Sequence, residues 1–182
     1  HEIPNINYSH SGYDYFSQKD ISYFSKKYIK DKNKKVVFMV RDPRDVFVSY
    51  FFQLTQRFDL AREKRKMNWD NIKISELLYN EDYGLNHIID FMNIWYNNLN
   101  ESNNVFHLIQ YEEIKKNQIV EFTKLLEFIS SEPINDAALN EAIQLSSFKK
   151  MKKNEQKKIH NLDQLNSLTD NENSSKVRKG IV

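Results

Sequence analysis

The stretch VVFMVRDPRDVFVSY, residues 36–50, decides the fold. Val36–Val40 is a continuous run of strand-forming apolar residues, which is typical of a strand covered on both faces in a parallel sheet. A helix is predicted to follow at once, because Asp42 is a good N-cap residue, Pro43 suits the first helical position and Asp45 places negative charge in the first turn. The stretch therefore predicts one strand–helix unit of an α/β protein.

Further segments extend this alternation along the chain. Their apolar residues follow helix or buried-strand patterns, and they are a helix at 85–99, a strand at Val105–Ile109, and helices at 112–130 and 135–145. The last helix has either Asn135 or Asp136 as its cap. The order predicts that the two strands, 36–40 and 105–109, are parallel neighbours or near neighbours in one sheet, with helices on both faces.

The two ends of the chain are less regular. Residues 3–9 suggest a short strand that ends at His10, and residues 11–34 suggest a loop with one helix near Ile21–Tyr28. Residues 154–177 are polar and rich in Asn, Ser and Asp, which predicts a long loop that acts as a lid.

Composition bounds the class of protein. The chain has 182 residues, of which 40% are hydrophobic, and this suits one domain over 1–182. A net charge of +2 is too small to argue for a nucleic-acid partner. Lysine-rich runs at 26–35 and 149–158 are either solvated surface or a collar that attracts an anion. The absence of cysteine excludes disulfides and thiolate metal sites and agrees with a cytoplasmic location. No apolar run approaches the roughly 20 residues that span a bilayer.

Arg41 is the first candidate for chemistry. It follows the strand at its carboxyl end, where ligands bind in parallel α/β sheets. Its guanidinium offers a bidentate fork for a phosphate, and backbone N–H groups at the start of the next helix add donors. Ser49, two turns into that helix, adds a hydroxyl. The spacing leaves open an alternative, in which Arg41–Asp45 forms a cluster of structural ion pairs beneath the helix.

RDPRDVFVSYFF resembles the 3′-phosphate-binding segment of the sulfotransferases that use 3′-phosphoadenosine 5′-phosphosulfate (PAPS). The family pattern is a strand, then Arg-Asp/Asn-Pro-x-Asp, then a serine eight residues after the arginine. Arg41 and Ser49 satisfy that spacing, and the resemblance implies that they hold the 3′-phosphate.

Two further motifs resemble the family's adenine contacts. Gln110–Glu113 (QYEE) is similar to the strand-end Tyr-Glu-Asp, which implies that Tyr111 lies near the adenine. SSFKKMKKN, residues 146–154, is similar to the family's Thr/Ser-Ser-Phe-x-x-Met-Lys-x-Asn stretch, which implies adenine contacts from Ser146 and Phe148. Taken alone, Tyr111 also suits a protein core, and Phe148 also suits a hydrophobic staple beneath the lysines.

A fourth motif lies near the end of the chain and completes the family's order. Arg178, Lys179 and Gly180 are similar to the Arg-Lys-Gly that closes over the 3′-phosphate. Read without the resemblance, the same residues suit a frayed basic tail. The four motifs occur in the family's order and about as far apart as the family has them. The resemblance therefore extends over nearly the whole chain.

The resemblance also implies a catalytic base, which in the family is a histidine at a strand end inside Lys-Ser/Thr-His. His10 is the favoured match, since Ser9 precedes it, although Tyr8 stands where Lys is common and the gap to Arg41 is longer than in the family. His1 is the rival, because HEIP matches a His-x-x-Pro that the family also contains. The other histidines have non-catalytic interpretations: packing for His87 and His107, surface for His160.

Two departures accompany the resemblance. The chain has no Pro-Lys-x-Gly-Thr loop for the 5′-phosphosulfate, and no Gly-Asp-Trp follows Arg-Lys-Gly. The resemblance therefore predicts a partial sulfotransferase domain with a P-loop-NTPase-like three-layer fold, in which helices flank a parallel sheet that is incomplete at both ends. We expect transfer of a sulfonate from PAPS to a hydroxyl or amine of a small-molecule or glycan acceptor, without a metal, and we expect the chain as given to be inactive.

The alternative to an enzyme is a relative that holds the nucleotide without transferring sulfonate. We expect loops such as 11–34 and 55–84 to select the acceptor, but their residues do not indicate its chemical class.

Overall fold

The computed structural model describes residues 6, 34–56, 71–81, 83–99, 106–130 and 132–157. The chain forms two compact units, of which the first comprises residues 1–42 and 85–134 and the second residues 43–84 and 135–182.

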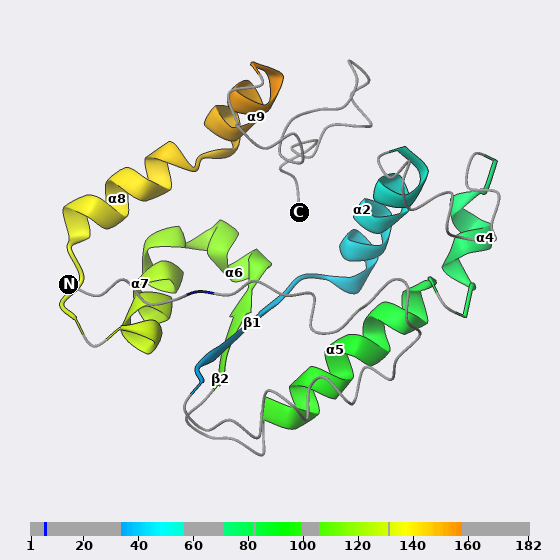
Figure 1. The fold of residues 1–182 in the computed structure, drawn as a ribbon, viewed down its shortest axis with the longest axis horizontal. Coiled ribbons are helices and arrows are strands. Elements are labelled where there is room, and N and C mark those ends of the chain that lie inside the picture. The colour runs from blue at the N-terminus through cyan, green and yellow to red at the C-terminus, as the bar shows by residue number, and fades with distance from the viewer. Residues whose placement is uncertain are drawn as a thin grey trace. The chain divides into compact units, whose positions relative to one another are not determined.

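The first unit is built on two parallel strands (Figure 1). Strand β1 spans Val36–Val40 and strand β2 spans Phe106–Gln110, one residue later than predicted. The register pairs Val36 with Phe106 and Val40 with Gln110. Parallel pairing of these two apolar runs is thus confirmed.

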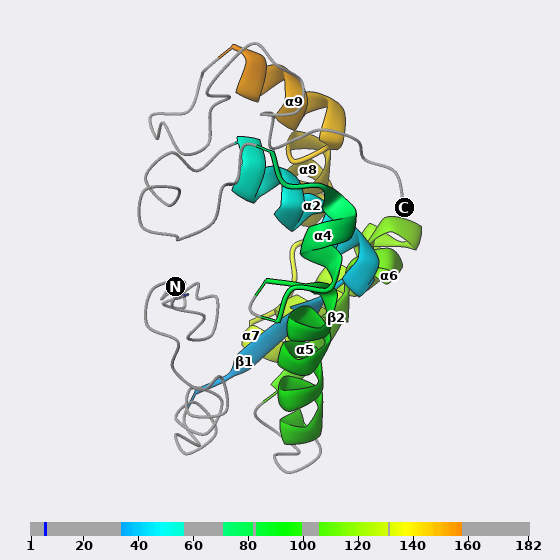
Figure 2. The same ribbon diagram turned by 90° about the vertical axis from the view of Figure 1, so that its right-hand side faces the viewer.

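An aromatic cluster joins one face of the strand pair to helix α5, which spans Leu85–Leu99 as predicted. The Trp95 ring lies 5.7 Å from that of Phe38 on β1 and 5.9 Å from that of Phe106 on β2, measured between centroids. Trp95 is 2% exposed, so the indole is almost fully removed from water. This cluster is the core of the first unit, and α5 lies beside the strands in both views (Figures 1 and 2).

The opposite face of the strands meets helix α7, Gln118–Ile129. His107 points away from the Trp95 side, because successive strand residues alternate between faces. Its ring stacks on Phe128 of α7 at 5.2 Å, and the Lys35 ammonium lies 5.6 Å from the centre of the same Phe128 ring. Helices therefore cover both faces of the strand pair, as predicted, and His107 has the packing role expected of it.

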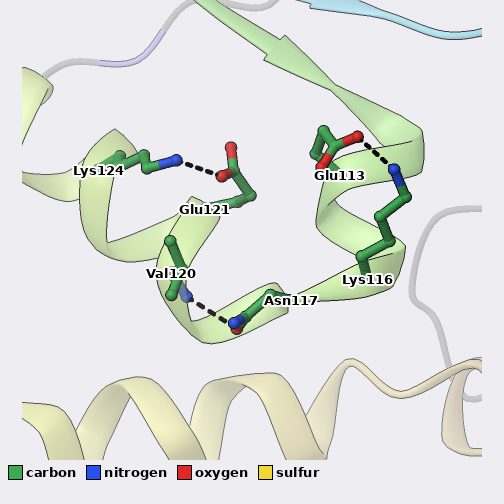
Figure 3. A network of polar contacts seen from close by, with 6 residues as sticks. All are labelled: Glu113, Lys116, Asn117, Val120, Glu121 and Lys124. Carbon is green, nitrogen blue, oxygen red and sulfur yellow. Dashed lines mark hydrogen bonds and ion pairs between the residues drawn. The ribbon is translucent and has the colours of Figure 1, made fainter.

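The single helix predicted at 112–130 is wrong, because the segment forms two helices. Helix α6 spans Tyr111–Lys116, and α7 begins after Asn117. Asn117 has a non-helical backbone (φ −148°, ψ 84°), and its side chain accepts a hydrogen bond from the Val120 N–H at 3.3 Å (Figure 3). Asparagine competes for backbone groups in this way, so it starts a new helix rather than continuing the old one.

Ion pairs within each helix flank this break. Glu113 pairs with Lys116 on α6, and Glu121 pairs with Lys124 on α7, both at 2.6 Å (Figure 3). The pKa of Lys116 is raised, chiefly by the hydrogen bond to Glu113 and then by the charge of that carboxylate. Exposed pairs of this kind add little stability.

The second unit contains helix α2, Pro43–Gln56, which begins at the predicted proline. Phe47 and Leu54 of α2 are buried, and so is Leu77 of helix α4, Ile74–Leu78. Helix α4 corrects the expectation that 55–84 is all loop. At its start the Glu76 carboxylate accepts from the Lys73 N–H at 3.1 Å.

Helices α8, Asp136–Leu145, and α9, Phe148–Gln156, also belong to the second unit. The Asn135 side chain accepts from the Ala138 N–H at 3.0 Å, so Asn135 rather than Asp136 is the cap. Helix α9 was not predicted, and it corrects the start of the lid loop, because the chain is still helical at Asn154.

Of the predicted strand at 3–9 only Ile6 is described, and it is exposed and outside any strand. The helix predicted near 21–28 lies outside the described residues. Among the described helices, none has the length and apolar character needed to cross a membrane.

Candidate functional site

The candidate site begins where the two strands stop pairing. Val40 and Gln110 form the last pair of the ladder. Arg41 is therefore the residue after β1, and Tyr111 is the residue after β2. The guanidinium carbon of Arg41 lies 4.5 Å from the centre of the Tyr111 ring. Both residues are partly buried. The structure thus brings together two residues that were predicted to bind the nucleotide and that are 70 positions apart in the sequence.

The stacked arrangement suits anion recognition. A cation held over an aromatic face gains about 0.5–2 kcal/mol, depending on its exposure. The guanidinium is planar, so when one face rests on a ring its N–H groups still point outward in its own plane. Arg41 therefore places a guanidinium, a group capable of bidentate phosphate binding, at the carboxyl end of β1, the edge of a parallel sheet where ligands bind.

At the next position, a hydrogen bond joins the segment after β1 to the segment after β2. The Asp42 N–H donates to Oε1 of Glu112 at 2.8 Å, in partly buried surroundings. The Asp42 N–H therefore already has a carboxylate acceptor. Glu112 was not among the residues predicted to form the site. Its place opposite Asp42 follows from the register of the two strands, which no local sequence pattern gives.

The predicted hydroxyl residue Ser49 and the two predicted adenine residues other than Tyr111 lie in the second unit. Ser49 is exposed on α2. Ser146 caps the carboxyl end of α8 and donates its hydroxyl to the Ala142 carbonyl at 2.7 Å, which leaves the oxygen able to accept. Phe148 is the first residue of α9 and is partly buried.

The lysines of α9 supply most of the positive charge in the described part of that unit. Lys149, Lys150 and Lys153 of this helix are exposed, and so is Lys157, which follows its last residue. The acid in the same helix, Glu155, is only 1% exposed, so the surface of α9 presents mainly cations. The exposure of these lysines agrees both with a solvated surface and with a positively charged surface that attracts an anion. Among the described residues no cluster of histidine and carboxylate side chains could hold a metal ion.

The other predicted residues are placed as follows. His10, its rival His1, and the closing residues Arg178, Lys179 and Gly180 lie outside the described residues. His87 lies on α5.

Comparison with known proteins identifies the class. A family model of the sulfotransferase domain matches residues 21–182. The chain therefore belongs to the sulfotransferase family, as its motifs predicted. None of the curated proteins matches the chain.

A solved structure agrees with the family. The chain is similar to mouse sulfotransferase SULT7A1, whose crystal structure is complexed with PAP, with 26% identity and a TM-score of 0.58. The match covers 85% of this chain and 51% of the mouse chain, so this chain spans about half the length of that enzyme. The predicted fold class, a P-loop-like α/β fold with a parallel sheet flanked by helices, is confirmed.

Proposed function

We propose that the protein to which this chain belongs transfers a sulfonate from PAPS to an acceptor hydroxyl or amine. The observation that carries the proposal is the stacking of Arg41 on Tyr111, at 4.5 Å, beyond the ends of two parallel strands in a sulfotransferase domain. A cation and a flat ring at this edge are what a phosphorylated adenine nucleotide requires. The PAP in the mouse neighbour supports the same class of ligand.

The 3′-phosphate of the nucleotide is assigned to Arg41 and Ser49, with Arg178, Lys179 and Gly180 closing over it. Three of these side chains are cations in the sequence. A dianionic phosphate gains most from charge-assisted hydrogen bonds, and arginine adds the bidentate geometry that lysine lacks.

The adenine is assigned to Tyr111, Ser146 and Phe148. An aromatic ring has two faces, so Tyr111 can support the Arg41 guanidinium on one and meet the base with the other or with its edge. Phe148 offers a second flat apolar surface, and the Ser146 oxygen retains an acceptor position.

The proposed transfer is a direct, in-line displacement. His10 takes the acceptor proton while the acceptor oxygen or nitrogen attacks sulfur. The bond between sulfur and the bridging phosphate oxygen breaks, and the nucleotide 3′,5′-bisphosphate leaves with the electron pair. Cations near the leaving phosphate stabilise its developing charge. The donor is already activated, so neither a covalent intermediate nor a metal is required.

Other assignments remain predictions. They are the single domain over 1–182, a lid within 154–177 that starts after α9, a small-molecule or glycan acceptor, and a cytoplasmic location.

Arg41→Ala in the complete protein tests the proposal. It should weaken binding of adenosine 3′,5′-bisphosphate by about 2–4 kcal/mol, since it removes a charge-assisted bidentate contact. Adenosine 5′-monophosphate should lose little, because it has no 3′-phosphate. Isothermal titration of both nucleotides measures the difference, and equal losses would show that Arg41 does not read the 3′ group. A wild-type protein that binds the bisphosphate but transfers no sulfonate from PAPS would favour the non-catalytic alternative.

A further inference from the structure

At the end of the strand ladder, the Asp42 N–H requires a hydrogen-bond acceptor. Beyond the last pair, Val40 and Gln110, a continued register would place Asp42 opposite Glu112. The segment after β2 cannot continue as a strand, because helix α6 begins at Tyr111. The backbone carbonyls of α6 point along the helix axis and not toward the segment after β1. The Glu112 side chain supplies an acceptor there instead, at 2.8 Å from the Asp42 nitrogen.

This contact acts on the peptide group that follows Arg41. The Asp42 N–H belongs to the same planar unit as the Arg41 carbonyl, so holding that N–H restricts the backbone rotation that aims Arg41. Tyr111 holds the other end of the same residue, its guanidinium. Two consecutive residues at the start of α6 thus hold Arg41 by its backbone and by its side chain.

We propose that Glu112 is a positioning residue for the 3′-phosphate contact. It does not touch the nucleotide, and it acts by fixing the Arg41–Asp42 peptide that carries the guanidinium. This inference rests on the proposed function, because it assumes that Arg41 reads the 3′-phosphate.

The chemistry of Glu112 separates this role from a charge effect. A carboxylate near a dianionic phosphate repels it, so the charge itself opposes nucleotide binding. The hydrogen bond needs only an acceptor oxygen, which glutamine also has. Removal of the acceptor and removal of the charge should therefore have different consequences.

The test compares three variants of the complete protein by titration with adenosine 3′,5′-bisphosphate and adenosine 5′-monophosphate. Glu112→Ala should raise the Kd of the bisphosphate about tenfold, the order of one lost charge-assisted hydrogen bond, and change that of the monophosphate less than about twofold. Glu112→Gln should stay within about twofold of wild type or bind more tightly. Glu113→Ala is the matched control, because the neighbouring carboxylate pairs with the exposed Lys116.

Three results would overturn the positioning role: Glu112→Ala affinity near wild type, an equal loss for both nucleotides, or a Glu112→Gln loss as large as that of Ala. If Glu112→Ala does not fold, Glu112→Met keeps the aliphatic stem without an acceptor and takes its place.

Amide hydrogen exchange at Asp42 tests the contact without any nucleotide. Exchange should be faster in Glu112→Ala than in wild type and should be slowed again in Glu112→Gln. Unchanged exchange in Glu112→Ala would overturn the proposal. If wild-type protein binds the two nucleotides equally, the proposed function fails, and the exchange result still decides whether Glu112 holds the peptide.

Discussion

Arg41 combines a positive charge with a flat side-chain group, and both bear on its position over an aromatic ring. The guanidinium lies 4.5 Å from the centre of the Tyr111 ring, a geometry that suits a planar cation. A lysine at this position would keep the charge but would lose both the stacking surface and the bidentate fork. At the scale of one residue, the proposed phosphate contact therefore calls for arginine in particular.

His10 carries the residue-scale prediction for catalysis. In the complete protein, His10→Ala should lower the turnover rate by about 10²–10⁴-fold, the usual contribution of a general base. Nucleotide affinity should stay nearly unchanged, because the phosphate and adenine contacts are assigned elsewhere. Steady-state kinetics with PAPS, together with nucleotide titration, measures both quantities.

His1→Ala is the control for this prediction and should do much less. The reverse ranking would favour the HEIP match over the Ser-His match as the base. If neither variant slows transfer, the proton goes to another group and the mechanism is wrong.

At the scale of elements, two asparagines start helices by the same device. Asn117 and Asn135 each accept a hydrogen bond from the backbone N–H three residues ahead, at 3.3 Å and 3.0 Å. Asn135 was predicted as one of two candidate caps, with Asp136 as the other. Asn117 was missed because apolar residues on both sides of it continue a helical spacing, so the pattern alone did not reveal the break.

The turn that precedes α5 gives a prediction for an element boundary. Gly84 is buried, and its N–H donates to the Asn80 carbonyl at 2.8 Å. A Cβ at Gly84 would collide with that same Asn80 carbonyl oxygen and would lie 2.7 Å from the Leu78 carbonyl oxygen. Both atoms are backbone, so they cannot rotate away as a side chain would.

Gly84→Ala should therefore lower the free energy of unfolding by about 1–3 kcal/mol, the usual cost of inserting a group where there is no room. Urea denaturation measures this change. Asn86→Ala, at an exposed position in the first turn of α5, is the control and should have little effect. Equal stability of Gly84→Ala and wild type would mean that the turn relaxes to accept the methyl group.

At the scale of the whole molecule, the first unit depends on one buried indole. Trp95 contacts rings from both strands and is 2% exposed, whereas its neighbour Tyr96 is 55% exposed. Trp95→Ala should lower the free energy of unfolding by about 3–5 kcal/mol, because it removes a large apolar surface and leaves a cavity. Tyr96→Ala should change it far less.

Chemical denaturation of the complete protein, followed by circular dichroism, compares the two variants. Similar losses would show that the aromatic cluster is not the main core. A selective loss in Trp95→Ala would confirm that α5 and the strand pair are stabilised as one packed unit.

Local sequence patterns determined much of this protein. The bounds of β1 and α5 and the start of α2 at Pro43 agree with the prediction, because apolar spacing and helix-start residues act within a few positions of the chain. Arg41 and Tyr111 were identified by motifs of the same local kind.

Only the tertiary structure decided how the strand ends are joined. The Arg41–Tyr111 stacking and the Asp42–Glu112 hydrogen bond each join residues 70 positions apart. No local pattern encodes such contacts, because they depend on the register of two strands and on the exact point at which β2 becomes α6. The sequence placed a cation at the end of a strand, and the pairing of that strand with its neighbour decides how the cation is aimed.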